Sequence, residues 1–440
     1  MAKHDKTPED IFCPIPFVGL YYKADNGKVT NCCLENHVDD EPLFKYDNSL
    51  SRYWKSKNVA EKRWAFMHNQ WPKGCLTCSK PESQGKTSAR INWRWAWRLL
   101  DNIRDAYPDR PDDILDIDYG NITAKPVYFD YRPDNLCNLG CAMCSPAASS
   151  ILVKMVDANP ELDKVDVLPN RLKPGVTFSD EDLVIAEELG PHTRRIKLNG
   201  GEPTISARIK NIYKQCIDND WAKNIELQFT TNFTNTNKTY DEILPHFKHI
   251  SLTASLDGTG ATYDYTRAPA KWTQVKKNIE GVILADKLKS FNFGVNLVWC
   301  ATTCYTIHQW LPELCDLFKW VKENQSKKTS DYYPGPVVNQ CWTPKWVALS
   351  VIPEEHKDEI RQGILNLRDH NASVREAIKT NPKMAVAVDD FLVGLDMFKF
   401  DPKHLTLFQN HITIYDKARK TDITQLHPRY KELLEYDRRS

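Results

Sequence analysis

Short runs of β-branched and aromatic residues alternate with amphipathic helical patterns over the middle of the chain. Six runs are strand candidates: residues 127–132, 195–199, 226–231, 249–256, 293–299 and 345–351. Apolar residues recur at helical spacing between them, as in residues 207–213 and 275–283. Such alternation favours a parallel sheet with helices outside it. We therefore predict an α/β fold, either an open doubly wound sheet or a partial barrel, with its chemistry at the carboxyl ends of the strands.

The pattern changes on both sides of this middle part. It divides the chain into four predicted parts, residues 1–90, 91–125, 126–353 and 354–440. The first part is rich in cysteine and interrupted by glycine and proline, which favours a small module organised by metal over a layered core. The second part is a connecting segment. The last part is polar and helical, with predicted helix ends at Asn381-Pro382 and Asp401-Pro402.

Composition narrows the class of protein. The formal net charge of 440 residues is +1, so no overall field favours nucleic acid or an acidic membrane. The amino terminus is polar and lacks the apolar core of a signal peptide, and no apolar run is long enough to span a bilayer. We expect a cytoplasmic protein. Thirteen cysteines are then better explained by metal ligation than by disulfides.

Three cysteines directly after the first strand candidate carry the strongest signal. Cys137, Cys141 and Cys144 have the spacing C-x3-C-x2-C. Three thiolates can hold a cubic iron-sulfur cluster and leave its fourth iron open, where a small molecule can be chelated and reduced. The alternatives are a structural zinc site or three buried thiols. Zinc usually takes four ligands in paired spacings, and no further cysteine or histidine nearby is spaced to match.

Glycine and polar residues follow the next strand candidates. Gly200, Gly201 and Glu202 end the second, and Ser255 and Asp257 end the fourth. Two adjacent glycines let the backbone approach a ligand closely. Each group alone is ordinary turn chemistry. Their occurrence at successive strand ends indicates a site along that edge of the sheet.

These motifs resemble those of the radical S-adenosylmethionine enzyme superfamily, over about residues 127–353. The resemblance implies a partial (β/α)6 barrel of the TIM type, with the cysteine triplet holding a [4Fe-4S] cluster. It also implies that S-adenosylmethionine binds the open iron and is cleaved reductively. The resulting 5'-deoxyadenosyl radical would abstract hydrogen from the substrate, after an external donor such as flavodoxin or ferredoxin has supplied the electron.

The same resemblance assigns roles to the residues around the cosubstrate. Gly200, Gly201 and Glu202 match the segment that holds the methionine amino group, so Glu202 would bind rather than act as a base. Ser255 and Asp257 match positions that contact the ribose. Arg267 resembles the arginine that pairs with the methionine carboxylate. Met143 stands where the family usually has an aromatic residue, and it can still offer its backbone to the adenine.

The amino-terminal cysteines resemble those of the twitch and SPASM extensions of this superfamily. The resemblance implies that Cys13, Cys32, Cys75 and Cys78 hold a second, auxiliary [4Fe-4S] cluster. The glycine-x4-cysteine spacing selects Cys32 over its neighbour Cys33, which could substitute. Four thiolates also suit zinc, so zinc is the alternative at this site.

The remaining cysteines carry weaker signals. Cys300 ends the fifth strand candidate, where its thiol could return a hydrogen atom to a substrate radical, although packing is the commoner role of such a residue. Cys304 lies four residues further on. We interpret Cys216 and Cys315, in helical patterns, as packing. We interpret Cys341 in the same way, because it precedes the sixth strand candidate and so falls on the wrong side of the sheet.

Substrate and reaction outcome stay open at this point. The expected substrate is a peptide or protein, modestly favoured, or a small molecule. One alternative is a noncatalytic zinc or iron-sulfur protein whose front module docks a partner. Another keeps the fold but transfers a methyl or methylthio group. The run from Trp93 to Trp97 could stack on bases, but it more often packs a domain junction, so we expect no nucleic-acid or membrane partner.

Overall fold

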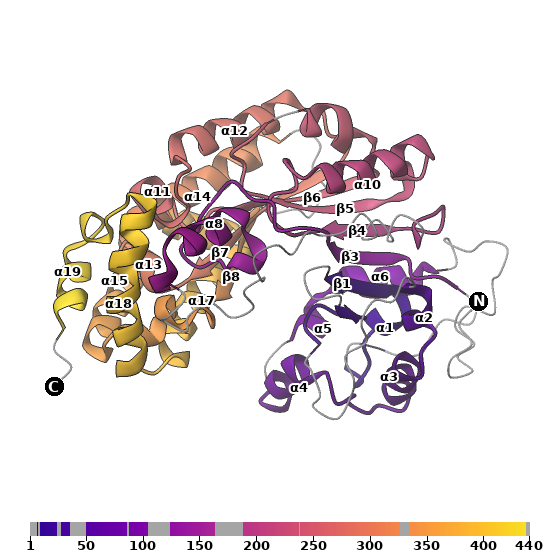
Figure 1. The fold of residues 1–440 in the computed structure, drawn as a ribbon, viewed down its shortest axis with the longest axis horizontal. Coiled ribbons are helices and arrows are strands. Elements are labelled where there is room, and N and C mark those ends of the chain that lie inside the picture. Colours follow the sequence, from indigo (N-terminus) through magenta and orange to yellow (C-terminus); the bar gives the residue numbers. More distant parts are fainter. Residues whose placement is uncertain are drawn as a thin grey trace.

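One sheet of eight strands forms the centre of the molecule (Figure 1). The computed structural model describes residues 7, 9–23, 28–35, 50–85, 88–103, 124–162, 188–236, 238–325 and 334–436. The strands are β1 (Gly19–Lys23), β2 (Lys28–Thr30), β3 (Tyr128–Arg132), β4 (Arg195–Leu198), β5 (Glu226–Thr231), β6 (His249–Ser255), β7 (Phe291–Trp299) and β8 (Gly335–Gln340). Their order across the sheet is β2-β1-β3-β4-β5-β6-β7-β8.

The order of the strands decides between the two predicted architectures. From β3 to β8 the spatial order follows the chain order, and every neighbouring pair is parallel. A doubly wound sheet would reverse its order at a switch point. The α/β class and the partial barrel of six parallel strands are therefore confirmed. β1 extends this run in parallel with β3, and β2 pairs antiparallel with β1.

The sixth strand was predicted in the wrong place. Residues 345–351, an apolar run, form two short turns of 3-10 helix, Lys345–Val347 and Leu349–Val351, which pack against α18 (Pro402–Arg419). The strand is β8, which begins with Gly335 and Pro336 and is absent from the six predicted runs. Proline is tolerated there because β8 is the last strand of the sheet order and starts at this point.

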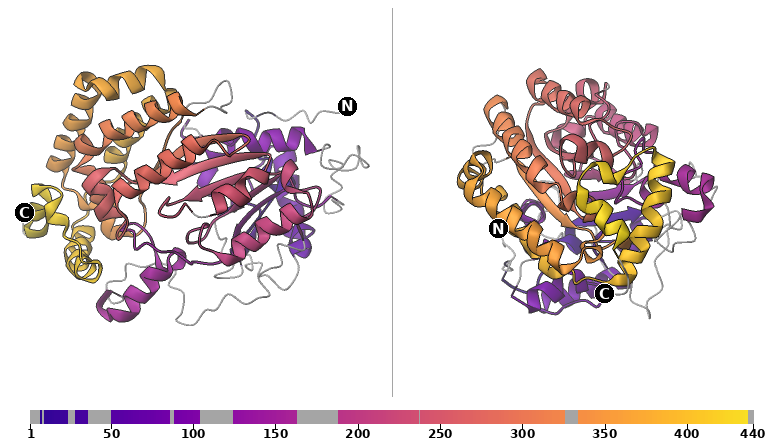
Figure 2. Two further views of the ribbon diagram at one scale, coloured as in Figure 1. Left: turned by 90° about the horizontal axis from the view of Figure 1, so that it is seen from above. Right: turned by 90° about the vertical axis from the view of Figure 1, so that its left-hand side faces the viewer.

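Helices cover the sheet on the side where its strands are apolar. The patterns at 207–213 and 275–283 are confirmed as α10 (Ala207–Asp218) and α12 (Trp272–Ala285). Together with α14 (Ile307–Asn324) they lie along one face of the sheet, as two views agree (Figures 1 and 2). Shorter helices follow the strands near their carboxyl ends: α8 (Ser150–Ala158), α11 (Gly260–Thr266) and α13 (Ala301–Cys304).

The other face of the central strands is polar. Burial alternates along β5, β6 and β7, as expected for strands with one apolar and one open side. We call the open side the polar face, and its half-buried residues are Glu226, Gln228, Thr230, His249, Ser251, Thr253, Ser255, Asn292, Gly294, Asn296 and Val298. Register places Ser251 beside Gln228 and Ser255 beside Asn296. Polar side chains therefore outnumber aliphatic ones on this face.

The amino-terminal part shares the hydrophobic core of the sheet. It does not stand apart as the small module without a layered core that the sequence predicted. Its helices are α1 (Ile15–Val18), α2 (Leu50–Trp54), α3 (Lys57–Met67), α4 (Leu76–Ser83), α5 (Ala89–Asn92) and α6 (Arg94–Asp101). Phe12, Phe17 and Trp54 belong to the hydrophobic cluster that also holds the strands. Trp95 packs against Tyr128 with ring centroids 4.6 Å apart, so the tryptophan run seals this part onto the sheet, as predicted.

The carboxyl-terminal part is helical, as predicted. It contains α15 (Glu354–His370), α16 (Ala372–Thr380), α17 (Pro382–Met397), α18 and α19 (Pro428–Glu435), which gather at the end of the molecule near α11 and α13 (Figure 1). The predicted helix boundaries are confirmed. Asn381 and Asp401 cap α17 and α18 by accepting hydrogen bonds from the backbone N–H of Lys383 and Lys403.

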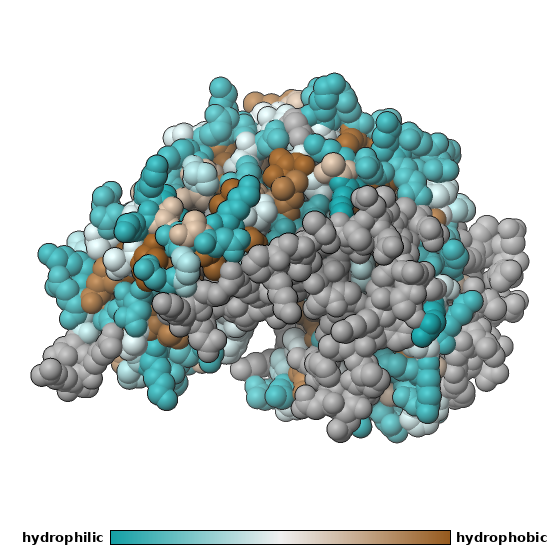
Figure 3. All heavy atoms as spheres, in the orientation of Figure 1, coloured by the Kyte–Doolittle hydropathy of each residue, from teal (hydrophilic) through white to brown (hydrophobic). Residues whose placement is uncertain are grey.

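Polar residues cover most of the described surface in the view of Figure 3, and apolar residues show as separate patches. None of the helices in the described ranges combines the length and apolar character needed to cross a bilayer.

Candidate functional site

The cysteine triplet lies on the loop that leaves β3, at the carboxyl edge of the sheet. Hydrogen bonds from several elements fix this loop. The Ser150 hydroxyl accepts from the backbone N–H of Cys137 at 3.1 Å, and the backbone N–H groups of Gly140 and Ala142 donate to the carbonyls of Ala268 and Thr266 at 2.9 and 2.8 Å. The loop therefore spans from α8 to the end of α11.

The three thiols are close enough to influence one another. Burial raises the pKa of Cys137 to about 12, and the charge of Cys141 raises it further. Burial likewise raises the pKa of Cys144 to about 12, with contributions from both other thiols. A bound cluster would take these side chains as thiolates, and its metal ions would offset the charge of three ligands so close together. This donor set fits an iron-sulfur cluster, since soft thiolate ligands select such clusters.

A buried ion pair links this loop to the fourth strand of the parallel run. Arg267 donates to the sulfur of Cys141 at 3.8 Å and pairs with Asp257 at 2.6 Å. Asp257, directly after β6, also accepts from the backbone N–H of Val298 at 2.6 Å. Two residues predicted to bind opposite ends of the cosubstrate thus contact each other here. Both stay predicted ligands, and their pairing places them beside the triplet.

Glu202 is held by its own chain. The residue is 2% exposed, and its carboxylate accepts four hydrogen bonds, from the backbone and hydroxyl of Thr204, the hydroxyl of Thr231 and the backbone N–H of Asn232. Burial raises the pKa of Glu202, and these four donors oppose the shift. The side chain therefore ties the end of β4 to the end of β5. Its predicted role as a binding group for the methionine amino group stays a prediction.

The two glycines before Glu202 allow a close approach of the backbone to the triplet loop, whereas the sequence predicted a close approach to a ligand. A Cβ at Gly200 would lie 2.2 Å from the carbonyl oxygen of Asp134, and one at Gly201 would lie 1.9 Å from that of Leu136. The backbone N–H of Glu202 donates to the same Leu136 carbonyl at 2.7 Å. The glycines thus bring the backbone against the loop that carries the triplet. Their predicted contact with a ligand stays a prediction.

The last two predicted cosubstrate residues lie on either side of this region. Ser255 ends β6 on the polar face and is half-buried. Met143 is half-buried in the triplet loop and packs against the main hydrophobic cluster. Ser255 lies two residues before Asp257, and Met143 lies between Cys141 and Cys144. Their predicted contacts with the nucleotide stay predictions.

The four amino-terminal cysteines converge from three separate segments. Cys13, Cys32, Cys75 and Cys78 line one cavity, together with Ile15, Pro16, Phe66 and Trp71. Burial raises the pKa of Cys13 to about 12, and the charge of Cys78 adds to this shift. Four thiols around one cavity fit a closed four-thiolate cluster or zinc by their donor chemistry. In the described ranges, no three or more His, Cys, Asp or Glu side chains are grouped tightly enough to hold a single metal ion.

The structure separates Cys32 from Cys33. Cys33 does not border the cavity, and its thiol interacts instead with Lys197, Asp130 and Arg132 on the sheet. The hydrogen bond shared with Cys32 is the main cause that lowers the pKa of Cys33, and Lys197 lowers it further. Cys32 therefore stays the proposed ligand.

Cys300 directly follows β7 and is fully buried. Its sulfur lies 3.2 Å from the hydroxyl of Thr302 at the start of α13, so it faces a helix start in this structure. Cys216 and Cys315 are buried on α10 and α14, as expected for packing. The interpretation of Cys341 was wrong in its placement, because the residue follows β8 and so lies at the carboxyl edge of the sheet.

Sequence reasoning missed the contribution of the carboxyl-terminal part. The hydroxyl of Tyr415, on α18, donates to the carbonyl oxygen of Cys141 at 2.9 Å. Arg419, one turn later, lies over the rings of Tyr415 and Tyr265 at 4.8 and 5.1 Å. No motif signals this contact, because it joins residues more than 270 positions apart. α18 therefore helps to hold the triplet loop.

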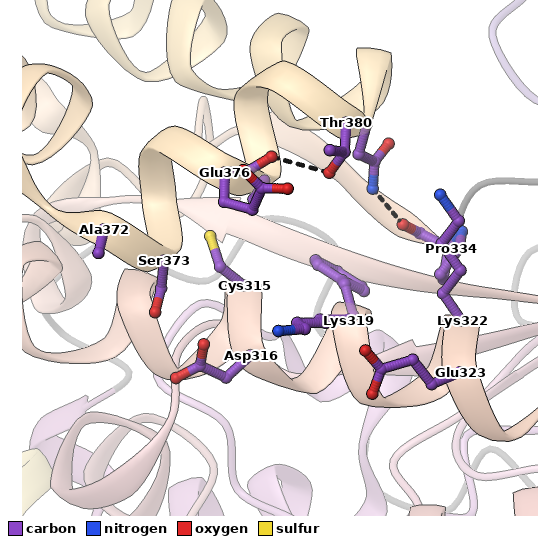
Figure 4. Close-up of a pocket in the computed structure, with 13 residues that line it drawn as sticks. Cys315, Asp316, Lys319, Lys322, Glu323, Pro334, Ala372, Ser373, Glu376 and Thr380 are labelled. Carbon is purple, nitrogen blue, oxygen red and sulfur yellow. Dashed lines mark hydrogen bonds between the residues drawn. The ribbon is translucent and has the colours of Figure 1, made fainter.

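A separate cavity of about 590 Å³ lies between α14 and α16 (Figure 4). Lys319, Lys322 and Glu323 line one side of it and Ser373 and Glu376 the other. It lies among the helices, and none of the predicted cluster or cosubstrate residues borders it.

Comparison with known proteins gives only distant structural similarity. No family model and no curated protein matches the chain. The crystal structure of Streptococcus suis SuiB aligns at 14% identity over 81% of this chain and 69% of that one, with a TM-score of 0.31. The same protein bound to its precursor peptide SuiA aligns at 14% over 71% and 62%, with a TM-score of 0.30. Native anSMEcpe with bound AdoMet aligns at 16% over 67% and 62%, with a TM-score of 0.31. Scores of this size carry no weight, so the proposal below rests on the residues of this chain.

Proposed function

We propose that the chain is a radical S-adenosylmethionine enzyme that abstracts hydrogen from its substrate. One observation carries this proposal. Cys137, Cys141 and Cys144 lie together on one fixed loop at the carboxyl edge of a parallel six-strand run, with a half-open polar face beside them. That edge is where sheets of this kind hold their chemistry.

The three thiols would hold a [4Fe-4S] cluster. When bound, such a cluster supplies an iron with a free coordination position and an electron for the reductive cleavage of S-adenosylmethionine. The chain supplies the environment. Arg267 places a positive charge next to Cys141, and Tyr415 and Ser150 hold the loop backbone. Burial of Cys141 and Ala142 in this loop would limit the access of water to a reactive radical.

Neighbouring side chains would position the cosubstrate. Glu202 and the glycines fix the end of β4 against the triplet loop, and Asp257 with Arg267 fixes the end of β6. To bind the ribose and the methionine carboxylate, Asp257 and Arg267 would exchange part of their mutual contact for the ligand. Ser255 and the backbone at Met143 would complete the cosubstrate site, since they lie on the same strand end as Asp257 and on the triplet loop.

The amino-terminal part would carry an auxiliary [4Fe-4S] cluster on Cys13, Cys32, Cys75 and Cys78. The cavity that these four thiols share supports this ligand set, and Cys33 lies outside it. Zinc at this site would leave the proposal for the triplet unchanged. We further propose residues 1–90 as the auxiliary part and 126–353 as the catalytic part.

The polar face would receive the substrate. Its hydroxyl and amide groups suit a peptide segment or another polar molecule better than an apolar one. A flavodoxin or ferredoxin would supply electrons.

Anaerobic reconstitution with iron and sulfide tests the proposal. We expect about eight irons per chain, four for each [4Fe-4S] cluster. Reduction with dithionite should then release 5'-deoxyadenosine from S-adenosylmethionine. Cys141→Ala should retain about half of the iron and should release no 5'-deoxyadenosine. Cys216→Ala, which changes a buried thiol on α10, should behave like the unaltered chain. Bound zinc without any cleavage would instead indicate a noncatalytic metal protein, and S-adenosylhomocysteine as a product would indicate transfer of a methyl group.

A further inference from the structure

Two cysteines outside both proposed metal sites stand side by side at the rim of the sheet. Cys300 follows β7 directly and Cys341 follows β8 directly. The last paired residues of these parallel strands are Trp299 and Gln340. The backbone N–H of Cys341 donates to the carbonyl of Trp299 at 3.2 Å, so the pairing continues one residue further.

Both side chains turn to the same side of the sheet. Trp299 and Gln340, one residue earlier, both reach α17, where they donate to the carbonyls of Phe391 and Asp390 at 3.1 and 2.9 Å. Because successive side chains of a strand alternate between faces, Cys300 and Cys341 point away from α17. Burial raises the pKa of both thiols, the charge of Cys300 raises that of Cys341 further, and the charge of Asp257 adds to the shift of each.

The spacing of neighbouring strands permits a covalent link between these residues. Adjacent strands lie about 4.8 Å apart, and disulfides join Cα atoms separated by roughly 4.4 to 6.8 Å. In this structure both residues are free thiols. Each sulfur has a local partner: Cys300 lies 3.2 Å from the Thr302 hydroxyl, and Cys341 donates to the carbonyl of Thr343 at 3.5 Å. A change of side-chain rotamer would release each sulfur toward the other.

We propose that Cys300 and Cys341 form a redox-active dithiol, seen here reduced, which closes to a disulfide by exchange with a small disulfide. Two S–H bonds break and one S–S bond forms between the two residues. The oxidant, a low-molecular-weight disulfide, takes up both electrons and both protons and leaves as two thiols. This site goes beyond the proposed function and does not depend on either cluster.

The position of the pair gives the disulfide a structural consequence. Val298 lies two residues before Cys300, and its backbone N–H donates to Asp257. Asp257 in turn pairs with Arg267, which contacts the sulfur of Cys141. A link across the ends of β7 and β8 therefore acts on the strand end that anchors this chain of contacts. Oxidation of the dithiol would therefore alter the contacts that hold the triplet loop.

Disulfide mapping tests the proposal on the purified full chain. The protein is incubated with oxidised glutathione without denaturant, quenched in acid, alkylated and digested without reduction. Mass spectrometry should find a peptide pair joined through Cys300 and Cys341 as the main product for both residues, and reduction with dithiothreitol should restore both thiols. Cys300→Ser and Cys341→Ser should each abolish that pair, whereas Cys315→Ser, which alters a buried thiol on α14, should leave it in place.

Two results would overturn the inference: both cysteines alkylated in a chain that keeps its native circular dichroism after full incubation, or Cys300 joined to Cys304 instead. Mapping of the unaltered chain decides the question even if a serine variant does not fold. Iron content and cleavage of S-adenosylmethionine play no part in this readout, so its failure would leave the proposed function untouched.

Discussion

At the scale of residues, the adjacent side chains of Cys32 and Cys33 lie in different environments. Cys32 lines the cavity of the amino-terminal thiols, and Cys33 faces Lys197 and Asp130. We therefore predict that Cys32→Ser lowers the iron of the reconstituted chain by about four atoms, one cubic cluster, while Cys33→Ser does not. Iron and sulfide analysis of both variants checks this. Full iron in both variants would show that either thiol can serve as the ligand, and equal loss in both would show that the cluster does not distinguish between them.

His411 on α18 allows a second prediction, about pH. Its ring packs against those of Trp346 and Tyr415, with centroid distances of 4.2 and 5.3 Å, and neither ring nitrogen has a hydrogen-bond partner among the described residues. Burial lowers the pKa of His411 to about 3. The unfolded chain therefore takes up a proton near pH 6.5 that the folded chain refuses, so the folded state loses stability as the pH falls below that value.

This one residue should remove about 2 kcal/mol from the free energy of unfolding between pH 7 and pH 5, by the linkage between pKa shifts and stability. His411→Phe keeps an aromatic ring in the stack and should reduce the loss between these pH values by about that amount. Urea denaturation at both pH values measures the difference, with the exposed His308→Gln as a control. A variant with the pH dependence of the unaltered chain would refute the account.

At the scale of elements, the end of β4 and the triplet loop fit together without room for a side chain. A methyl group at Gly201 would meet the backbone carbonyl of Leu136 at 1.9 Å. Gly201→Ala should therefore lower the free energy of unfolding by about 1 to 3 kcal/mol, as overpacking does, and should lower the iron retained by the triplet.

Gly281→Ala is a matched control for that change. Gly281 lies on α12 with open space around its Cβ position, and alanine there should raise the free energy of unfolding by up to about 1 kcal/mol. Denaturation curves of the two variants check both signs. If Gly201→Ala were as stable as the unaltered chain and kept its iron, the close approach seen here would not matter.

The elements also show where the sequence pattern was sufficient. Strands with one apolar and one polar side, such as β5 and β6, were predicted nearly to the residue, because their alternation of residues is regular. β8 was missed because glycine and proline open it and only part of it is buried. The run at 345–351 was predicted as a strand because its residues are mostly apolar, but these residues are buried in two short turns that pack against α18.

At the scale of the whole molecule, contacts between distant segments were beyond the reach of sequence patterns. The spacing of the triplet was enough to predict three cysteines on one loop. The pairing of Asp257 with Arg267 and the bond from Tyr415 to Cys141 depend on how β6, α11 and α18 pack. So does the continuous sheet of amino-terminal and central strands, where local cysteine spacing suggested a separate small module.

The central claim is that three thiolates hold a cluster whose fourth iron is free to bind S-adenosylmethionine. Electron paramagnetic resonance of the reconstituted, dithionite-reduced chain tests it directly, before and after S-adenosylmethionine is added. To isolate the triplet signal, the measurement is made on Cys32→Ser, in which the amino-terminal site should lack its cluster. The account predicts a [4Fe-4S] signal whose g-values shift on addition of the nucleotide. An unchanged signal, or the absence of any cubic cluster at the triplet, would contradict it.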